Sequence, residues 1–167
     1  MTLKELNNLG ETNLKVALFN CCGSNKWVSK MLVGFPVEDE LGLYFLASKC
    51  WDACIEPDYL EAFSHHPKIG DIGSLKRKFA ATANWASGEQ AGVNTADEET
   101  LEQLQEGNKL YEEKFGFIFI VCATGKSAAE MLDLLKQRLP NNKEDEIKIA
   151  AAEQHKITLI RLEKLLQ

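Results

Sequence analysis

Two adjacent histidines, in the stretch AFSHHPKIGD over residues 62–71, are the first candidates for chemistry in this sequence. Pro67 follows them directly and restricts the backbone there, while Gly70 and Gly73 allow a tight loop. We therefore expect His66 on a rigid corner at the end of a helix. An unperturbed imidazole titrates at about pH 6.5, which suits proton transfer near neutral pH. A histidine that only caps a helix end would show the same pattern.

A second polar pair, Glu89 and Gln90, stands in the stretch NWASGEQAGVN, four residues after Trp85. In a helix, Trp85 would cover the carboxylate and favour its neutral form. Outside a helix, Gly88 and Gly92 would let the backbone approach a ligand closely. Taken alone, this segment is explained better by an ordinary solvated Glu–Gln pair.

An arginine near the C-terminus is expected to face inward. At about 100° per residue, Arg161 falls on the helical wheel among Ile147, Ala150, Gln154, Ile157 and Leu165, which forms the expected core side. A buried guanidinium needs an anionic partner, because burying its charge unpaired is costly. The partner is either a protein carboxylate or a bound anionic ligand, and the pattern does not decide between them.

Metal binding and thiol chemistry are both disfavoured. Neighbouring histidine side chains usually diverge, His155 is far along the chain, and no HxH or HxxxH pair exists. The five cysteines are an odd number without paired CxxC spacings: Cys21, Cys22, Cys50, Cys54 and Cys122. We therefore expect reduced, mostly buried thiols rather than disulfides, a zinc site or a nucleophile.

The composition narrows the classes of partner. The chain has 167 residues with 45% hydrophobic content, enough for one compact core. With 19 Lys and Arg against 25 Asp and Glu, the net charge is −6, so nucleic acid is not an expected partner. No signal-peptide pattern and no run of apolar residues long enough to cross a bilayer is present, so we expect a cytoplasmic protein without membrane contact.

The elements that must position these residues are predicted to be helices. Possible capping boxes pair Thr2 with Glu5, "TADE" at 95–98 with the helix that follows, and Ser127 with Glu130. Helices are expected to end at Gly23, to cover 26–33, 37–54, 57–65, 95–115 and 127–139, and to begin at 75 and at about 143. The helix over 37–54 is expected to be largely buried, with apolar residues at Leu41, Phe45, Ala47 and Cys54.

One segment does not fit a helical period. Residues 117–123 form a continuous apolar run of β-branched and aromatic side chains, which predicts a short extended piece, although periodicity alone does not exclude a buried helix. The sequence therefore predicts an all-α fold with one extended apolar segment, and a single domain over residues 1–167.

Together, the stretches FSHHPKIGD, GEQAGV, YEEKFGFIFIVCATGKS and ITLIRLEKLL resemble the 2-oxo-4-hydroxy-4-carboxy-5-ureidoimidazoline (OHCU) decarboxylase family. The resemblance covers essentially the whole chain, and the order HPxIG, EQ, FGFxFI is specific. It implies an all-α homodimer that decarboxylates OHCU to (S)-allantoin in urate degradation, with neither metal nor organic cofactor.

The resemblance also implies roles for individual residues. The catalytic pair would be Glu89 and His66, the histidine directly before proline. Substrate contacts would come from Pro67, Ser87, Gln90, Arg161 and the main chain of Phe119, Ile120, Val121, Cys122 and Ala123. The family often has a serine three residues before the glutamate, where this chain has Ala86 and then Ser87. Ser87 would replace that contact with a shifted geometry.

These residue types suit a decarboxylation. Loss of CO2 from a quaternary carbon leaves electron density that an adjacent ring imine can accept, and a proton must then arrive on one face. His66 can exchange that proton, Glu89 can orient the substrate or set the state of the imidazole, and Arg161 can hold an anionic oxygen. Two other classes stay open: a hydrolase of ureido or amide compounds, and a non-catalytic helical binding module.

Overall fold

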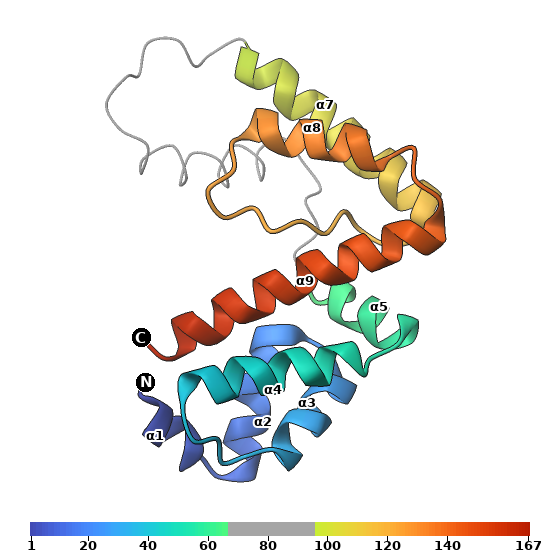
Figure 1. The fold of residues 1–167 in the computed structure, drawn as a ribbon. Coiled ribbons are helices and arrows are strands. Elements are labelled where there is room, and N and C mark those ends of the chain that lie inside the picture. The colour runs from blue at the N-terminus through green and yellow to red at the C-terminus, as the bar shows by residue number, and fades with distance from the viewer. Residues whose placement is uncertain (67–95) are drawn as a thin grey trace, which may run out of the picture. The chain divides into compact units, whose positions relative to one another are not determined.

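The computed structural model describes residues 1–66 and 96–167, and within these residues the chain is helical and has no strand (Figure 1). The predicted all-α class is confirmed. The chain divides into two compact units, one made of 1–66 with 147–167 and the other of 67–146. The expectation of one domain over 1–167 stays a prediction. No helix in the described ranges is long and apolar enough to cross a membrane.

The first unit contains five short helices and most of a long one. They are α1 (Leu3–Asn7), α2 (Glu11–Cys22), α3 (Asn25–Val33), α4 (Glu40–Asp52), α5 (Glu56–Ser64) and the greater part of α9 (Lys143–Leu165). The predicted capping box of Thr2 and Glu5 is present, and the Ser24 hydroxyl accepts from the Trp27 amide as the N-cap of α3. Pro57 stands at the start of α5, where its missing amide hydrogen costs nothing.

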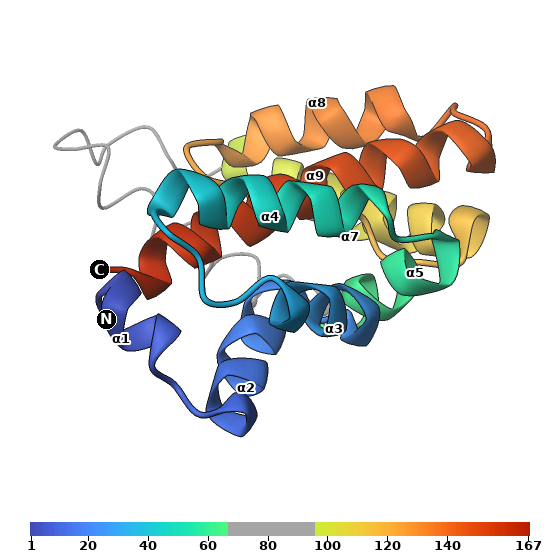
Figure 2. The ribbon, with the colours of Figure 1, turned by 60° about the horizontal axis from the view of Figure 1, so that its bottom comes forward.

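The apolar core of this unit is built around α3 and α4. Trp27, Leu43 and Phe63 are almost completely buried, and the Trp27 indole donates to the Ala47 carbonyl at 3.0 Å. Figure 2 shows α4 running alongside α9. The Trp51 indole on α4 donates to the Ala151 carbonyl on α9, also at 3.0 Å.

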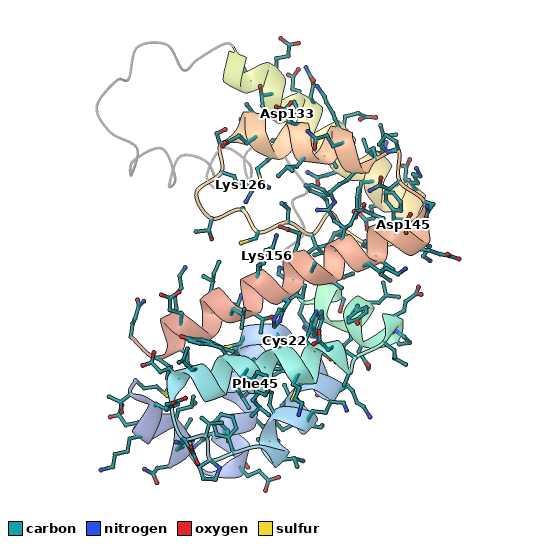
Figure 3. All side chains as sticks on the ribbon, viewed as in Figure 1. Cys22, Phe45, Lys126, Asp133, Asp145 and Lys156 are labelled. Atoms are coloured by element: carbon teal, nitrogen blue, oxygen red, sulfur yellow. The ribbon has the colours of Figure 1, made fainter. Side chains whose placement is uncertain are left out.

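The expectation that Leu41 and Phe45 would be buried on α4 is wrong. These side chains are 77% and 66% exposed, and Phe45 is labelled in Figure 3. The buried face of α4 is formed by Leu43, Ala47, Cys50 and Trp51. Leu41 and Phe45 each lie two residues from Leu43, about 200° around the helix, and so on the opposite face.

The second unit pairs α7 (Ala96–Phe115) with α8 (Ala128–Arg138), which pack side by side (Figure 1). Ser127 and Glu130 form the predicted capping box of α8. Between the two helices, residues 118–123 have neither helical nor strand structure, so the alternative of a buried helix at this place is excluded. The helix expected from residue 75 and the N-cap expected at Thr95 lie outside the described residues.

The end of α2 is a tight turn at Gly23. Its φ is +81°, a left-handed conformation that favours glycine, and its amide donates to the Phe19 carbonyl at 2.7 Å. A Cβ at this position would lie only 3.0 Å from the Cβ of His65. Glycine therefore lets the last turn of α2 and the residue after α5 approach each other closely.

Gly23→Ala should destabilise the protein more than the left-handed conformation alone requires. The strained φ costs about 1–2 kcal/mol, and the contact with His65 adds to it. Gly116→Ala is the matched control. Gly116 has a φ of +80°, and among the described residues no atom apart from its chain neighbours lies within 4 Å of its added Cβ. Urea unfolding should show a larger loss of stability for Gly23→Ala; equal losses would show that crowding by His65 has no effect.

Candidate functional site

His66 lies where the sequence predicted it, directly after α5. The amides of His65 and His66 donate to the carbonyls of Ala62 and Phe63, both at 3.2 Å, and the helical hydrogen bonding ends there. The two histidines then separate. The exposed ring of His65 packs edge-on against Phe19, with ring centroids 4.9 Å apart, whereas His66 is half-buried and bonds to α9.

The contact of His66 on α9 is Gln154. The Nε2 atom of His66 lies 2.5 Å from the side-chain oxygen of Gln154. Gln154 is completely buried, and its amide nitrogen donates to the Cys22 carbonyl at 3.4 Å and to the Thr158 hydroxyl at 3.2 Å. Figure 3 labels Cys22, the last residue of α2. The sequence placed Gln154 on the inward face of the last helix but gave no sign of its polar partners.

Arg161 lies on the same side of α9 as Gln154. The two are seven residues apart, close to two full turns, so their side chains leave the helix in nearly the same direction. Arg161 is half-buried, and its Nη1 atom donates to the Cys21 carbonyl at 3.2 Å. Within residues 1–66 and 96–167 no carboxylate forms an ion pair with it. In this part of the chain, the structural ion pair considered from the sequence is not formed.

The thiols beside this site are poor nucleophiles. All five cysteines are within the described residues, are buried, and form no disulfide. Burial raises the pKa of Cys21 to about 11 and that of Cys22 to about 12. At neutral pH both therefore remain thiols, as the sequence predicted.

The third histidine, His155, is held in a different way. The Ser48 hydroxyl donates to the Tyr44 carbonyl at 2.9 Å, so His155 Nε2, also 2.9 Å from that hydroxyl, must be the donor between them. The neutral ring then carries no hydrogen on Nδ1, which is buried and has no hydrogen-bond partner among the described residues. Burial lowers the pKa of His155, against a weaker opposing effect of Asp52.

This arrangement predicts a pH dependence of stability. Because the pKa of His155 is lower in the folded state, the unfolded chain binds more protons as the pH falls below about 6.5. The stability that neutral His155 contributes is complete above that pH and is lost below it. Urea unfolding at pH 7.5 and at pH 5.5 measures the free energy of unfolding, which should fall more between these pH values in wild type than in His155→Gln. Parallel losses would contradict the assignment.

In the second unit, Arg138 anchors the extended segment. Its Nη1 atom donates to the Ile120 carbonyl at 2.8 Å, and its guanidinium carbon lies 4.6 Å from the centre of the Phe119 ring. The opposing charge is Glu146, which is fully buried and accepts from Arg138 Nε at 2.7 Å and from the Tyr111 hydroxyl. Burial and the bond to this carboxylate raise the pKa of Tyr111.

Two main-chain carbonyls of this segment accept hydrogen bonds from cationic side chains. Lys126 Nζ donates to the Cys122 carbonyl at 2.8 Å, as Arg138 does to that of Ile120. Among the described residues, the amide and carbonyl of Val121 form no hydrogen bond. Val121 is half-buried, so water or a polar ligand could supply a partner for these groups.

Arg138→Met should destabilise the protein strongly, because it leaves the buried carboxylate of Glu146 without its cation. The expected loss is about 3–5 kcal/mol in the free energy of unfolding. Adding Glu146→Gln removes the uncompensated charge and should recover a large part of that loss. Urea unfolding of both single variants and the double variant measures this coupling; additive losses would contradict it.

Four of the predicted site residues lie outside the described residues: Pro67, Ser87, Glu89 and Gln90. His66 and Arg161 belong to the first unit, and residues 119–123 belong to the second. No group of three His, Cys, Asp or Glu side chains that could hold a metal is found in the described part of the chain.

The chain belongs to the OHCU decarboxylase family, whose model, described as OHCU decarboxylase, matches residues 7–163. The uric acid degradation bifunctional protein TTL of Arabidopsis thaliana is 38% identical over 157 residues, which are 94% of this chain and 47% of that protein. The 2-oxo-4-hydroxy-4-carboxy-5-ureidoimidazoline decarboxylase of Haloferax volcanii is 25% identical over 97% of this chain and 94% of its own. The chain thus spans about half the length of the bifunctional plant relative.

Solved structures agree with this membership. A crystal structure of OHCU decarboxylase in the presence of (S)-allantoin matches with a TM-score of 0.70 at 38% identity, covering 89% of this chain and 95% of that one. A crystal structure of (S)-allantoin synthase also gives a TM-score of 0.70, with 17% identity, and shows the shared fold alone.

Proposed function

We propose that this chain decarboxylates OHCU to (S)-allantoin in urate degradation. The observation that carries the proposal is the pairing of His66 with Gln154, on the same side of α9 as an arginine that has no carboxylate partner among the described residues. Both side chains belong to the same compact unit, which supports their proposed roles in proton transfer and anion binding. Family membership supplies the substrate class.

The substrate is an anion whose carboxylate sits on a quaternary ring carbon. In the proposed reaction, the bond to the carboxylate breaks and its electrons pass toward the adjacent imine, and CO2 leaves. The imine nitrogen takes up a proton, and the ring hydroxyl loses its own as a carbonyl forms at the carbon that lost CO2. A proton is then delivered on one face to the adjacent carbon, formerly the imine carbon, which fixes the configuration of the product. His66 handles this proton, and Arg161 holds an anionic oxygen of the substrate.

Other residues are proposed to orient the heterocycle. Glu89 assists His66, and further contacts come from Pro67, Ser87 and Gln90. The main chain of 119–123 contacts the ring, a role supported by the unpartnered amide and carbonyl of Val121. We further propose that the enzyme is a cytoplasmic homodimer that uses neither metal nor organic cofactor.

Product analysis separates this proposal from the two other classes. Freshly generated OHCU is incubated with the enzyme, and both released CO2 and released ammonia are measured. A decarboxylase releases CO2 and keeps the ureido nitrogen, whereas a hydrolase releases ammonia. A non-catalytic binding module leaves the spontaneous rate unchanged.

His66→Ala should remove most of the turnover, by about a hundredfold or more, as expected for a general acid or base. His65→Ala is the matched control, since His65 is exposed and packs on Phe19 rather than on α9. It should have a much smaller effect, and circular dichroism should show helical structure in both variants. Near-normal turnover by His66→Ala would contradict the assigned role.

Arg161→Ala should weaken substrate binding, raising KM more than it lowers kcat. Its guanidinium contacts a main-chain carbonyl rather than a described carboxylate, so its removal leaves no buried anion in that part of the chain. Steady-state kinetics on OHCU and thermal unfolding are measured together. A large loss of stability with unchanged KM would instead indicate a structural role.

A further inference from the structure

The geometry around Gln154 leads to an inference about His66 that deepens the proposed function and rests on it. We propose that Gln154 is a positioning residue that keeps a proton on Nε2 of His66, so that Nδ1 is the nitrogen that exchanges a proton with the substrate. Neither the sequence motifs nor the family comparison assigns a role to Gln154.

Two acceptors fix which end of the amide is the nitrogen. The Cys22 carbonyl can only accept, and it lies 3.4 Å from the Gln154 nitrogen. The Thr158 hydroxyl gives its own hydrogen to the main-chain carbonyl of Gln154 at 3.1 Å, so it accepts from the side-chain nitrogen at 3.2 Å. A rotated amide would set its oxygen against both acceptors, inside a fully buried site.

The oxygen of Gln154 is therefore the end that meets His66. An amide oxygen only accepts, so the Nε2 atom 2.5 Å away must carry a hydrogen. In the neutral ring this leaves Nδ1 without a hydrogen, and protonation then occurs at Nδ1. The bond to Gln154 is kept in both charge states, so the ring keeps its orientation while its charge changes.

The Cys22 carbonyl that starts this chain of bonds is available for a structural reason. The last four carbonyls of a helix have no partner within it, and Cys22 is the final residue of α2. A side chain on α9 thus satisfies the end of one helix and orients the histidine after another. Gln154 contacts no reacting atom in this account and acts only through His66.

The first test reads the tautomer directly and needs no substrate. Wild-type protein labelled with 15N-histidine is measured by NMR above the titration of the ring, where protonated and bare ring nitrogens have clearly different 15N shifts. The signals that disappear in His65→Gln and in His155→Gln belong to those two histidines, and the signals left in both variants belong to His66. We expect the hydrogen of His66 on Nε2; a hydrogen on Nδ1 would overturn the proposal.

The second test is kinetic and uses two variants of similar shape. Gln154→Met keeps the length of the side chain but removes the acceptor, and it should lower kcat about tenfold or more with little change in KM. Thr158→Ser changes a buried neighbour of Gln154 but keeps the hydroxyl that accepts from its nitrogen, so it should retain most of kcat. Equal kcat losses in the two variants, or none in Gln154→Met, would refute the positioning role.

The two proposals fail in different ways. If wild type does not accelerate the decay of OHCU, the proposed function is wrong, and the tautomer measurement still decides the state of His66. If wild type is active but His66 carries its hydrogen on Nδ1, only the role of Gln154 is wrong. Should Gln154→Met fail to fold, the wild-type spectrum remains decisive.

Discussion

The candidate site depends on the C-terminal end of α2, whose last carbonyls need hydrogen-bond partners from outside the helix. Its last two residues, Cys21 and Cys22, present carbonyls that cannot bond within the helix. Both are satisfied by side chains of α9, through Arg161 and Gln154. The last helix is thereby held at the end of α2, although Gln154 and Cys22 are 132 residues apart in the sequence.

This constraint explains why polar side chains occupy part of the core of the first unit. Gln154 and Thr158 are almost completely buried, and burying an amide or a hydroxyl costs free energy unless every polar atom has a partner. Here each does, and the oxygen of Gln154 has His66. In the second unit the buried polar groups are charged: Arg138 and Glu146 form a buried ion pair, and Arg138 donates to the carbonyl of Ile120. In both units a buried polar group orients a residue that was singled out from the sequence.

Local signals in the sequence predicted the helices well, because caps and breakers act over a few residues. Thr2 and Ser127 each cap the helix that follows, and Gly23 ends α2 with a positive φ. The burial of Leu41 and Phe45 was predicted wrongly, because α4 has apolar residues on two faces and only packing decides which one is covered. The exit of α5 before His66 was predicted from proline alone.

The site was predicted only in part, because its partners come from distant segments. Arg161 was expected to face inward, but its acceptor is a main-chain carbonyl. Every residue has such a carbonyl, so the pattern of side chains in the sequence does not predict which one is the partner. Gln154 was placed on the inward face without a role, since nothing local connects it to His66. The extended form of 118–123 was predicted, but its attachment to Arg138 required the fold.

The configuration of the product tests the central claim most directly. OHCU that decays without a catalyst is protonated from both faces and gives racemic allantoin, whereas an oriented site delivers the proton to one face. Circular dichroism of the product from wild-type enzyme and fresh OHCU should show the (S) enantiomer forming faster than the uncatalysed decay. A racemic product at the uncatalysed rate would contradict the account.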